Sequence, residues 1–196
     1  MKTYKIGIFG IAHNHAKILM RDFLKLGDRV QFLGFTDYEP CFDLQGRIKE
    51  SLPNDFELPY YKNPYDLIAL KPDIGIVCSD NASHAEVAIS LMENGIIPII
   101  EKPMADNMDN AIRIYETSVK TGVEFIVNWP VAWFPAFNLA KKLLDEGAIG
   151  EPMRFIYRTT ATLGPYSHSG PRRFNDYENY SWWYNSKRGG GALLDY

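Results

Sequence analysis

The chain has 196 residues, of which 46% are hydrophobic and 14% aromatic, so it can bury a sizeable core and has no disordered or low-complexity character. Its formal net charge of -3 gives no reason to expect nucleic acid or an anionic membrane as a partner. We expect a cytoplasmic protein, because the N-terminus runs directly into a strand pattern without room for a signal peptide and no apolar run is long enough to span a bilayer.

The first strand, turn and helix of the chain are predicted between Lys5 and Gly27. A short apolar run ends at Gly10, and a helical pattern follows within a few residues. The apolar residues of this helix share one face: Ala16, Leu19, Met20, Phe23 and Leu24. A buried strand followed by an amphipathic helix is half of a βαβ unit. Its turn offers free backbone N–H groups and the positive end of a helix dipole, which suits a phosphate.

The glycine fingerprint of this turn is incomplete. The motif G-x-G-x-x-G would fall on Gly10, Ala12 and His15, so only its first glycine is present. Ala12 adds a methyl group where a pyrophosphate comes close, and His15 places a ring where helix and strand usually touch. The candidate cofactor-binding residues of the turn are Gly10, Ile11, Ala12, Asn14 and His15.

The second strand, 30–36, is followed by Asp37. Asp37 lies somewhat more than 20 residues past the glycine turn, about where a carboxylate accepts the ribose hydroxyls of a dinucleotide. The alternative is an aspartate in a turn before Pro40. No arginine or lysine follows immediately to hold a 2'-phosphate, so the sequence favours NAD over NADP.

A further buried strand is predicted at 73–79, after a short strand at 59–62 and a helix at 64–70. Ser79, Asn81 and His84 then fall at or just beyond its carboxyl end, the edge where open α/β sheets bind ligands. For His84, a helix-capping or solvent-exposed role is the alternative. Ser83 and Glu86 have the spacing of a capping box, which predicts a helix from this point to Gly95.

The next strand, 96–100, is followed by Glu101, Lys102 and Pro103. An ammonium group at the carboxyl edge of the sheet can stabilise a developing alkoxide or transfer a proton, which makes Lys102 a candidate catalytic residue. The alternative is a solvated surface lysine.

The rest of the chain continues the pattern and then changes it. A helix is predicted after an Asn107 cap, with an apolar face at Met108, Ala111, Ile112, Tyr115 and Val119 and an end at Gly122. The segment 123–127 is predicted as the sixth strand of the sheet, followed by Asn128 and Trp129 at the binding edge. A helix at 135–146 precedes residues 153–162, whose period-two alternation predicts an antiparallel strand.

Three further groups of residues are candidates for a functional role. The segment 163–188 is a long polar and aromatic loop, suited to stacking on a sugar ring or to domain or dimer packing. His13 and His15 lie two residues apart in a turn, but no carboxylate cluster in the sequence completes a metal site, so we expect no metal. Cys41 and Cys78 have no CxxC partner and indicate neither a disulfide framework nor a thiolate metal site.

Five motifs together carry a family resemblance: GIAHNH at 10–15, SDNASH at 79–84, EKPMADN at 101–107, EGAIGEP at 146–152 and GGGALLD at 189–195. In this order and spacing they resemble the Gfo/Idh/MocA oxidoreductases, which act mostly on sugars and cyclitols with NAD(P). The resemblance implies a Rossmann-type, doubly wound parallel α/β sheet over residues 1–126. It also implies that residues 127–196 begin a second α+β domain with a mostly antiparallel sheet.

The resemblance also implies a reaction and a site. The expected activity is hydride transfer between NAD and a secondary alcohol of a sugar or cyclitol. Lys102 would stabilise the alkoxide, Asp195 would support catalysis, and the cofactor would contact Asp37 and the group Ser79, Asn81, His84, Glu101, Lys102 and Asn128. A non-catalytic nucleotide or sugar sensor and an NAD-dependent glycosidase of the same family remain alternatives.

Compared with the family pattern, this chain resembles an N-terminal fragment. The family places its acid/base histidine four residues after the aspartate that corresponds to Asp195, and this sequence stops at Tyr196. We therefore expect the fragment to bind NAD at best, with little or no turnover. The family also implies a homo-oligomer for the full-length protein, with no nucleic-acid or membrane partner expected.

Overall fold

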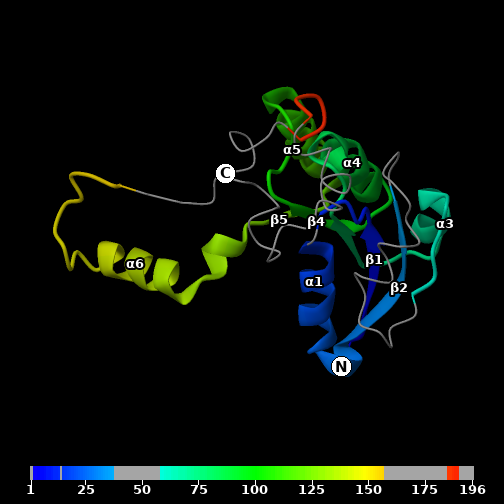
Figure 1. The fold of residues 1–196 in the computed structure, drawn as a ribbon, viewed down its shortest axis with the longest axis horizontal. Coiled ribbons are helices and arrows are strands. Elements are labelled where there is room, and N and C mark those ends of the chain that lie inside the picture. Colours follow the sequence, from blue (N-terminus) through cyan, green and yellow to red (C-terminus); the bar gives the residue numbers. More distant parts are fainter. Residues whose placement is uncertain (1, 14, 38–57, 157–184, 190–196) are drawn as a thin grey trace, which may run out of the picture.

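A computed structural model describes residues 2–13, 15–37, 58–156 and 185–189. At its centre is a parallel sheet of five strands in the order β2-β1-β3-β4-β5 (Figure 1). The strands are β1 Tyr4–Phe9, β2 Val30–Thr36, β3 Ile74–Val77, β4 Ile97–Glu101 and β5 Ile126–Asn128. Chain order reverses between β1 and β3, which makes the carboxyl ends of these two strands the switch point of the sheet.

The segment predicted as a strand at 59–62 is reduced to a single parallel bridge between Phe35 and Tyr60. The described sheet therefore has five strands rather than the six that the sequence analysis counted, and 126–128 is the fifth. When the bridge is added beside β2, the spatial order becomes 3-2-1-4-5-6, the order common to dinucleotide-binding folds. The predicted Rossmann-type sheet is thus confirmed, with one strand shortened to a bridge.

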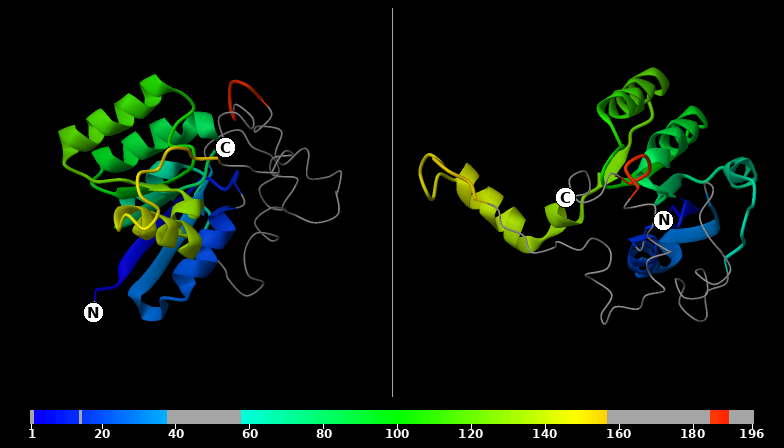
Figure 2. Two further views of the ribbon diagram at one scale, coloured as in Figure 1. Left: turned by 90° about the vertical axis from the view of Figure 1, so that its left-hand side faces the viewer. Right: turned by 45° about the horizontal axis from the view of Figure 1, so that its top comes forward.

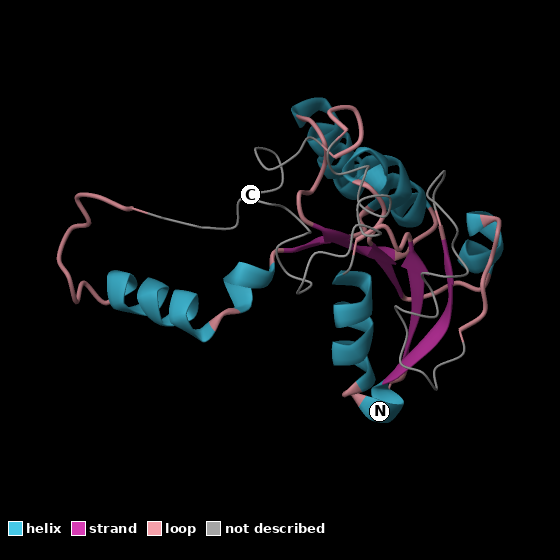
Figure 3. Cartoon of the chain, viewed as in Figure 1, coloured by secondary structure: helices cyan, strands magenta, loops and turns pink. Residues whose placement is uncertain are grey.

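Helices cover both faces of the sheet, as the continuous apolar runs of its strands require (Figures 1 and 3). On one face, α1 (His15–Leu24) packs Ala16 and Met20 near Ile6 and Ile8. On the other face, Phe9, Val77 and Ile100 pack with α3 (Pro64–Ala69) and α4 (His84–Glu93). The predicted face of α4 is buried in this core, together with Ala85: Val87, Ala88, Leu91 and Met92.

The helix α5 (Met108–Thr121) has the predicted ends, but most of its predicted face is not the buried one. Asn107 Oδ1 accepts a hydrogen bond from Asn110 N at 2.9 Å, and Gly122 closes the helix in the left-handed conformation. Four of the five residues of the predicted apolar face are exposed, Met108, Ile112, Tyr115 and Val119, whereas Ala111 packs partly buried against the core and Ile114 is the buried residue. Packing against α4 selects this side of the helix.

Beyond β5 the chain leaves the sheet. The helix α6 (Pro135–Asp145) extends away from it and buries none of its residues (Figures 1 and 2). The predicted antiparallel strand at 153–162 is wrong over 153–156, which form no strand, and its remainder lies outside the described residues. The predicted domain boundary after residue 126 falls inside β5 and stays a prediction. Among the described helices, none has both the length and the apolar character needed to cross a bilayer.

Candidate functional site

The carboxyl ends of three strands meet at Gly10. Its backbone N–H donates to Thr36 O, at the end of β2, over 2.9 Å. A Cβ added to Gly10 would lie 2.4 Å from the backbone nitrogen of Ser79, just beyond β3, and Gly10 has a φ of +90°. Only glycine fits both the close approach and this conformation. The first glycine of the fingerprint therefore brings the turn after β1 against the end of β3, at the switch point.

The two missing glycines are replaced in different ways. Ala12 has only 3% of its surface exposed, so its methyl group is packed within the protein. The turn is held by a hydrogen bond from His13 N to Cys78 O at 3.1 Å, and Ala16 N donates to His13 O at the start of α1. Ile11 lies in this turn, whereas Asn14 lies outside the described residues. A helix N-terminus thus begins at the switch point, where it can receive an anion.

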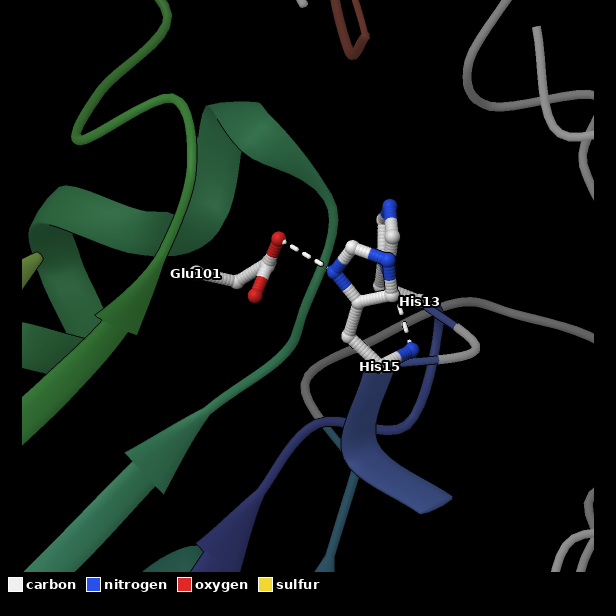
Figure 4. A group of neighbouring side chains, drawn as sticks. All are labelled: His13, His15 and Glu101. Carbon is white, nitrogen blue, oxygen red and sulfur yellow. Dashed lines mark hydrogen bonds and ion pairs between the residues drawn. The ribbon is translucent and has the colours of Figure 1, made fainter. Parts of the chain in front are cut away.

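His15 joins the turn to β4 and β5. Its Nδ1 lies 2.7 Å from Glu101 Oε1 (Figure 4). On the other side of the carboxylate, Asn128 Nδ2 donates to Glu101 Oε2 over 2.7 Å. The His13 ring stands edge-on to the His15 ring with centroids 4.2 Å apart, and His13 Nδ1 accepts from His15 N. The carboxylate that the sequence analysis did not find near the two histidines is Glu101, 86 residues further along the chain.

Glu101 is almost completely buried, with 1% of its surface exposed. The negative charge of Glu101 also affects the Cys78 thiol. The pKa of that thiol is raised mainly by the burial of Cys78 and further by the charge of Glu101. A buried carboxylate requires compensation by hydrogen bonds and positive charge. The contacts to His15 and Asn128 provide hydrogen bonds to both of its oxygens.

His84 is fully buried rather than exposed at the helix start. Its Nδ1 lies 2.8 Å from Pro103 O, and its Nε2 lies 3.2 Å from Ser79 O. Burial lowers the pKa of His84, although these carbonyls and nearby Glu101 partly oppose the shift. The ring therefore connects the loops after β3 and β4 from inside the protein.

The loop after β3 is capped by Asp80 rather than by the predicted Ser83–Glu86 pair. A short 3-10 helix, η2 (Asn81–Ser83), precedes α4, and Asp80 Oδ1 accepts from Ser83 N at 3.0 Å. The Ser83 side chain makes no capping hydrogen bond. The 3-10 turn moves the cap three residues upstream of the position expected from the motif.

A second segment, 185–189, binds to this loop. Arg188 Nε donates to Asp80 Oδ2 over 2.6 Å, Ala82 N donates to Arg188 O over 2.9 Å, and Asn81 Nδ2 donates to Gly189 O over 2.7 Å. Neither Asp80 nor Arg188 was singled out from the sequence, because nothing in the local pattern connects residues 108 positions apart.

The remaining candidates lie along the same edge of the sheet. Asp37 directly follows β2, and Lys102 directly follows β4; both are half-buried. The Lys102–Pro103 peptide bond is cis. Asn128 is buried at the end of β5, and Trp129 beside it is exposed. Asp195 lies outside the described residues.

A parallel sheet in this order, with a glycine turn at its switch point, defines a nucleotide-binding α/β domain of the Rossmann type. The family model described as an oxidoreductase family with an NAD-binding Rossmann fold matches residues 5–129. The chain belongs to this family, the Gfo/Idh/MocA oxidoreductases.

Several curated relatives are dehydrogenases. An inositol 2-dehydrogenase of Salmonella typhimurium is 27% identical over 77% of this chain and 44% of its own length. A 1-carboxy-3-chloro-3,4-dihydroxycyclo hexa-1,5-diene dehydrogenase of Comamonas testosteroni is 26% identical over 97% of this chain and 44% of its own length. A levoglucosan dehydrogenase of Pseudarthrobacter phenanthrenivorans is 36% identical over 43% of this chain and 22% of its own length. The chain spans less than half the length of these relatives.

Solved structures show the same fold. An oxidoreductase structure from Erwinia carotovora atroseptica matches with a TM-score of 0.72 and 18% identity, over 98% of this chain and 53% of that one. The WlbA dehydrogenase of Bordetella pertussis was solved in complex with NADH and UDP-GlcNAcA. It matches with a TM-score of 0.65 and 19% identity, over 75% of this chain and 42% of that one. At these identities the likeness concerns the fold.

Proposed function

We propose that the chain binds NAD across the switch point between β1 and β3. The observation that carries this proposal is the approach of Gly10 to Ser79, which places a tight turn and the N-terminus of α1 together at that edge. The pyrophosphate would lie on the turn 10–13 and on the first N–H groups of α1. Asp37, at the end of β2, would accept hydrogen bonds from the adenosine ribose.

NAD is preferred over NADP in this proposal. A carboxylate at the Asp37 position accepts hydrogen bonds from the 2'- and 3'-hydroxyls, but it repels a 2'-phosphate. The sequence has no arginine or lysine immediately after Asp37 that could hold such a phosphate.

The reaction we propose is oxidation of a secondary alcohol of a sugar or cyclitol, or its reverse. When bound, NAD supplies the hydride acceptor. Lys102, at the end of β4, would stabilise the negative charge that develops on the substrate oxygen as the hydroxyl proton leaves. Ser79, Asn81 and Asn128 would line the same edge. Asp195 is proposed as a supporting residue on the basis of the family motif alone. The substrate class is supported by the names of the relatives, which include inositol and levoglucosan dehydrogenases.

Calorimetric titration of NAD and NADP into the chain tests the cofactor proposal. Asp37→Ala is compared with Asp28→Ala, because Asp28 is exposed beside the opposite, amino end of the same strand. We expect NAD to bind more tightly than NADP, and the Asp37 variant to lose most of this preference while the Asp28 variant keeps it. Equal affinities for both cofactors, or no binding by folded protein, would contradict the proposal.

Product analysis tests the reaction. The protein is incubated with inositols or levoglucosan and NAD, and both NADH and organic products are measured. Net NADH formation with a ketone product supports a dehydrogenase, and Lys102→Met should then lower kcat strongly. Glycosidic bond cleavage without net NADH would instead indicate the NAD-dependent glycosidase activity. Binding without either product would agree both with a sensor and with the low turnover expected of a fragment.

A further inference from the structure

The cluster of His13, His15 and Glu101 goes beyond what dinucleotide binding requires. One nitrogen from each histidine and one carboxylate oxygen lie within 4.8 Å of one another (Figure 4). The three residues come from the turn after β1, the first residue of α1 and the last residue of β4. The fold therefore brings together two imidazoles and a carboxylate from distant parts of the sequence.

Two imidazoles and one carboxylate form a donor set used by zinc. Catalytic zinc sites use three protein ligands of this kind, His, His and Glu, and keep a further position open for water or substrate. A divalent ion also compensates the charge of the buried Glu101, and because both imidazoles are neutral the complex keeps a net positive charge. We propose that His13, His15 and Glu101 form a binding site for a divalent transition-metal ion, with Zn²⁺ as the preferred occupant.

The present distances require only small movements to accept the ion. His15 Nδ1 and Glu101 Oε1 are 2.7 Å apart, the separation of a hydrogen bond. Zinc bonds of about 2.0–2.1 Å in a tetrahedron place neighbouring ligand atoms roughly 3.3 Å apart. The His15–Glu101 pair would open by about half an ångström, and the ligand nitrogen of His13 already lies within 4.8 Å of both other ligand atoms. Binding replaces the hydrogen bond between His15 and Glu101 with one bond from each residue to the ion.

Groups around the cluster support its geometry. Asn128 Nδ2 donates to Glu101 Oε2 over 2.7 Å and so fixes the carboxylate plane while Oε1 faces the histidines. A hydrogen bond of this kind to a metal-binding side chain orients that side chain and strengthens metal binding. His13 and Glu101 are buried, whereas His15 is partly exposed, so the open coordination position has access to solvent on the His15 side.

The competing explanation for this cluster is an ion pair without metal. A protonated His15 would compensate Glu101 by itself, and the hydrogen bonds already described would then hold the cluster together. The two explanations differ in one measurable property, because only the metal site takes up one ion per chain with an affinity that depends on both histidines.

The test is titration of Zn²⁺, and separately Co²⁺, into metal-free protein in the absence of NAD. We expect one ion per chain, visible Co²⁺ absorption bands of a low-coordinate site, and at least tenfold weaker binding in both His13→Gln and His15→Gln. Asn128→Ala should weaken binding about 10- to 100-fold. X-ray absorption of the Zn²⁺ complex should show nitrogen and oxygen ligands at about 2.0–2.1 Å and no sulfur.

Control variants keep these results specific. His168→Gln removes the one histidine beyond the described residues, and Glu86→Gln removes an exposed carboxylate of α4; both should bind the ion as the wild type does. Circular dichroism confirms that each variant is folded. No stoichiometric uptake by folded wild-type protein, unchanged affinity in both His13→Gln and His15→Gln, or sulfur ligation would overturn the site. Because no NAD is present, these outcomes do not depend on the cofactor proposal.

Discussion

Arg188 and Asp80 form an ion pair across 108 residues of sequence, with the guanidinium Nε and Nη2 atoms 2.6 Å and 2.5 Å from the same carboxylate oxygen. The Asp80 side chain is 3% exposed and that of Arg188 is 23% exposed, so the pair is largely shielded from water. The other carboxylate oxygen caps η2 through Ser83 N. One aspartate therefore shapes the loop after β3 and also holds the segment that leads into the glycine motif.

Removing the arginine leaves a buried carboxylate oxygen without its charged partner. We expect Arg188→Ala to lower the free energy of unfolding by about 1.5–3 kcal/mol, the range for hydrogen bonds to charged groups. Arg21→Ala, at an exposed position of α1, should change it by less than about 0.5 kcal/mol. Urea unfolding measures both values. Equal effects of the two variants would mean that the 185–189 segment does not bind to the loop in solution.

The turn at the switch point is tested by adding one methyl group. Gly10→Ala would place a Cβ 2.4 Å from Ser79 N at a φ of +90°, whereas Gly27→Ala has a φ of +57° and open space. Both variants incur backbone strain of about 1 kcal/mol or more. The Gly10 variant should cost about 1–3 kcal/mol beyond that, because backbone atoms cannot move aside as a flexible side chain does. Matching losses of stability in thermal or urea unfolding would contradict the close approach.

The strands were predictable because their burial depends on local composition. The strand 30–36 has the predicted bounds, the apolar run 73–79 contains β3, and the run 96–100 covers β4 except for its last residue, Glu101. Burial on both faces requires such runs, and Gly10 and Asp37 follow their strands where the motif places them. The sheet edge that carries the candidate site could therefore be read from the sequence.

The contacts between side chains at that edge could not be predicted in the same way. Glu101 meets His15 because β4 lies two strands from β1, and Arg188 meets Asp80 through a segment outside the sheet. No local spacing encodes either pair. His84 is buried because it lies between two loops whose approach depends on the whole fold, so its position at a helix start was misleading.

Two substitutions test which face of α5 packs against the core, where the sequence pattern and the structure disagree. Ile114 has none of its surface exposed, while Tyr115 is 62% exposed although it belongs to the predicted apolar face. Ile114→Ala should cost about 2–5 kcal/mol through the cavity it creates in the core around α4. Tyr115→Ala should change the free energy of unfolding by less than about 0.5 kcal/mol, as expected for an exposed position. A larger loss for Tyr115→Ala in urea unfolding would show that α5 packs through the other face.

The burial of His84 predicts a pH dependence of stability. The pKa of His84 is lowered by burial from its ordinary value of 6.5, so the unfolded chain binds a proton at a higher pH than the folded chain does. Stability from this residue is fully present above pH 6.5 and is lost as the pH falls through that value toward the lower folded pKa. The slope reaches at most about 1.4 kcal/mol per pH unit.

His84→Gln keeps a hydrogen-bond donor but cannot titrate, and at pH 7.5 it should lower the free energy of unfolding by about 1–3 kcal/mol. The difference in unfolding free energy between wild type and variant should shrink on acidification below pH 6.5. A constant difference across this range, measured by urea unfolding at several pH values, would show that His84 has the same pKa in both states.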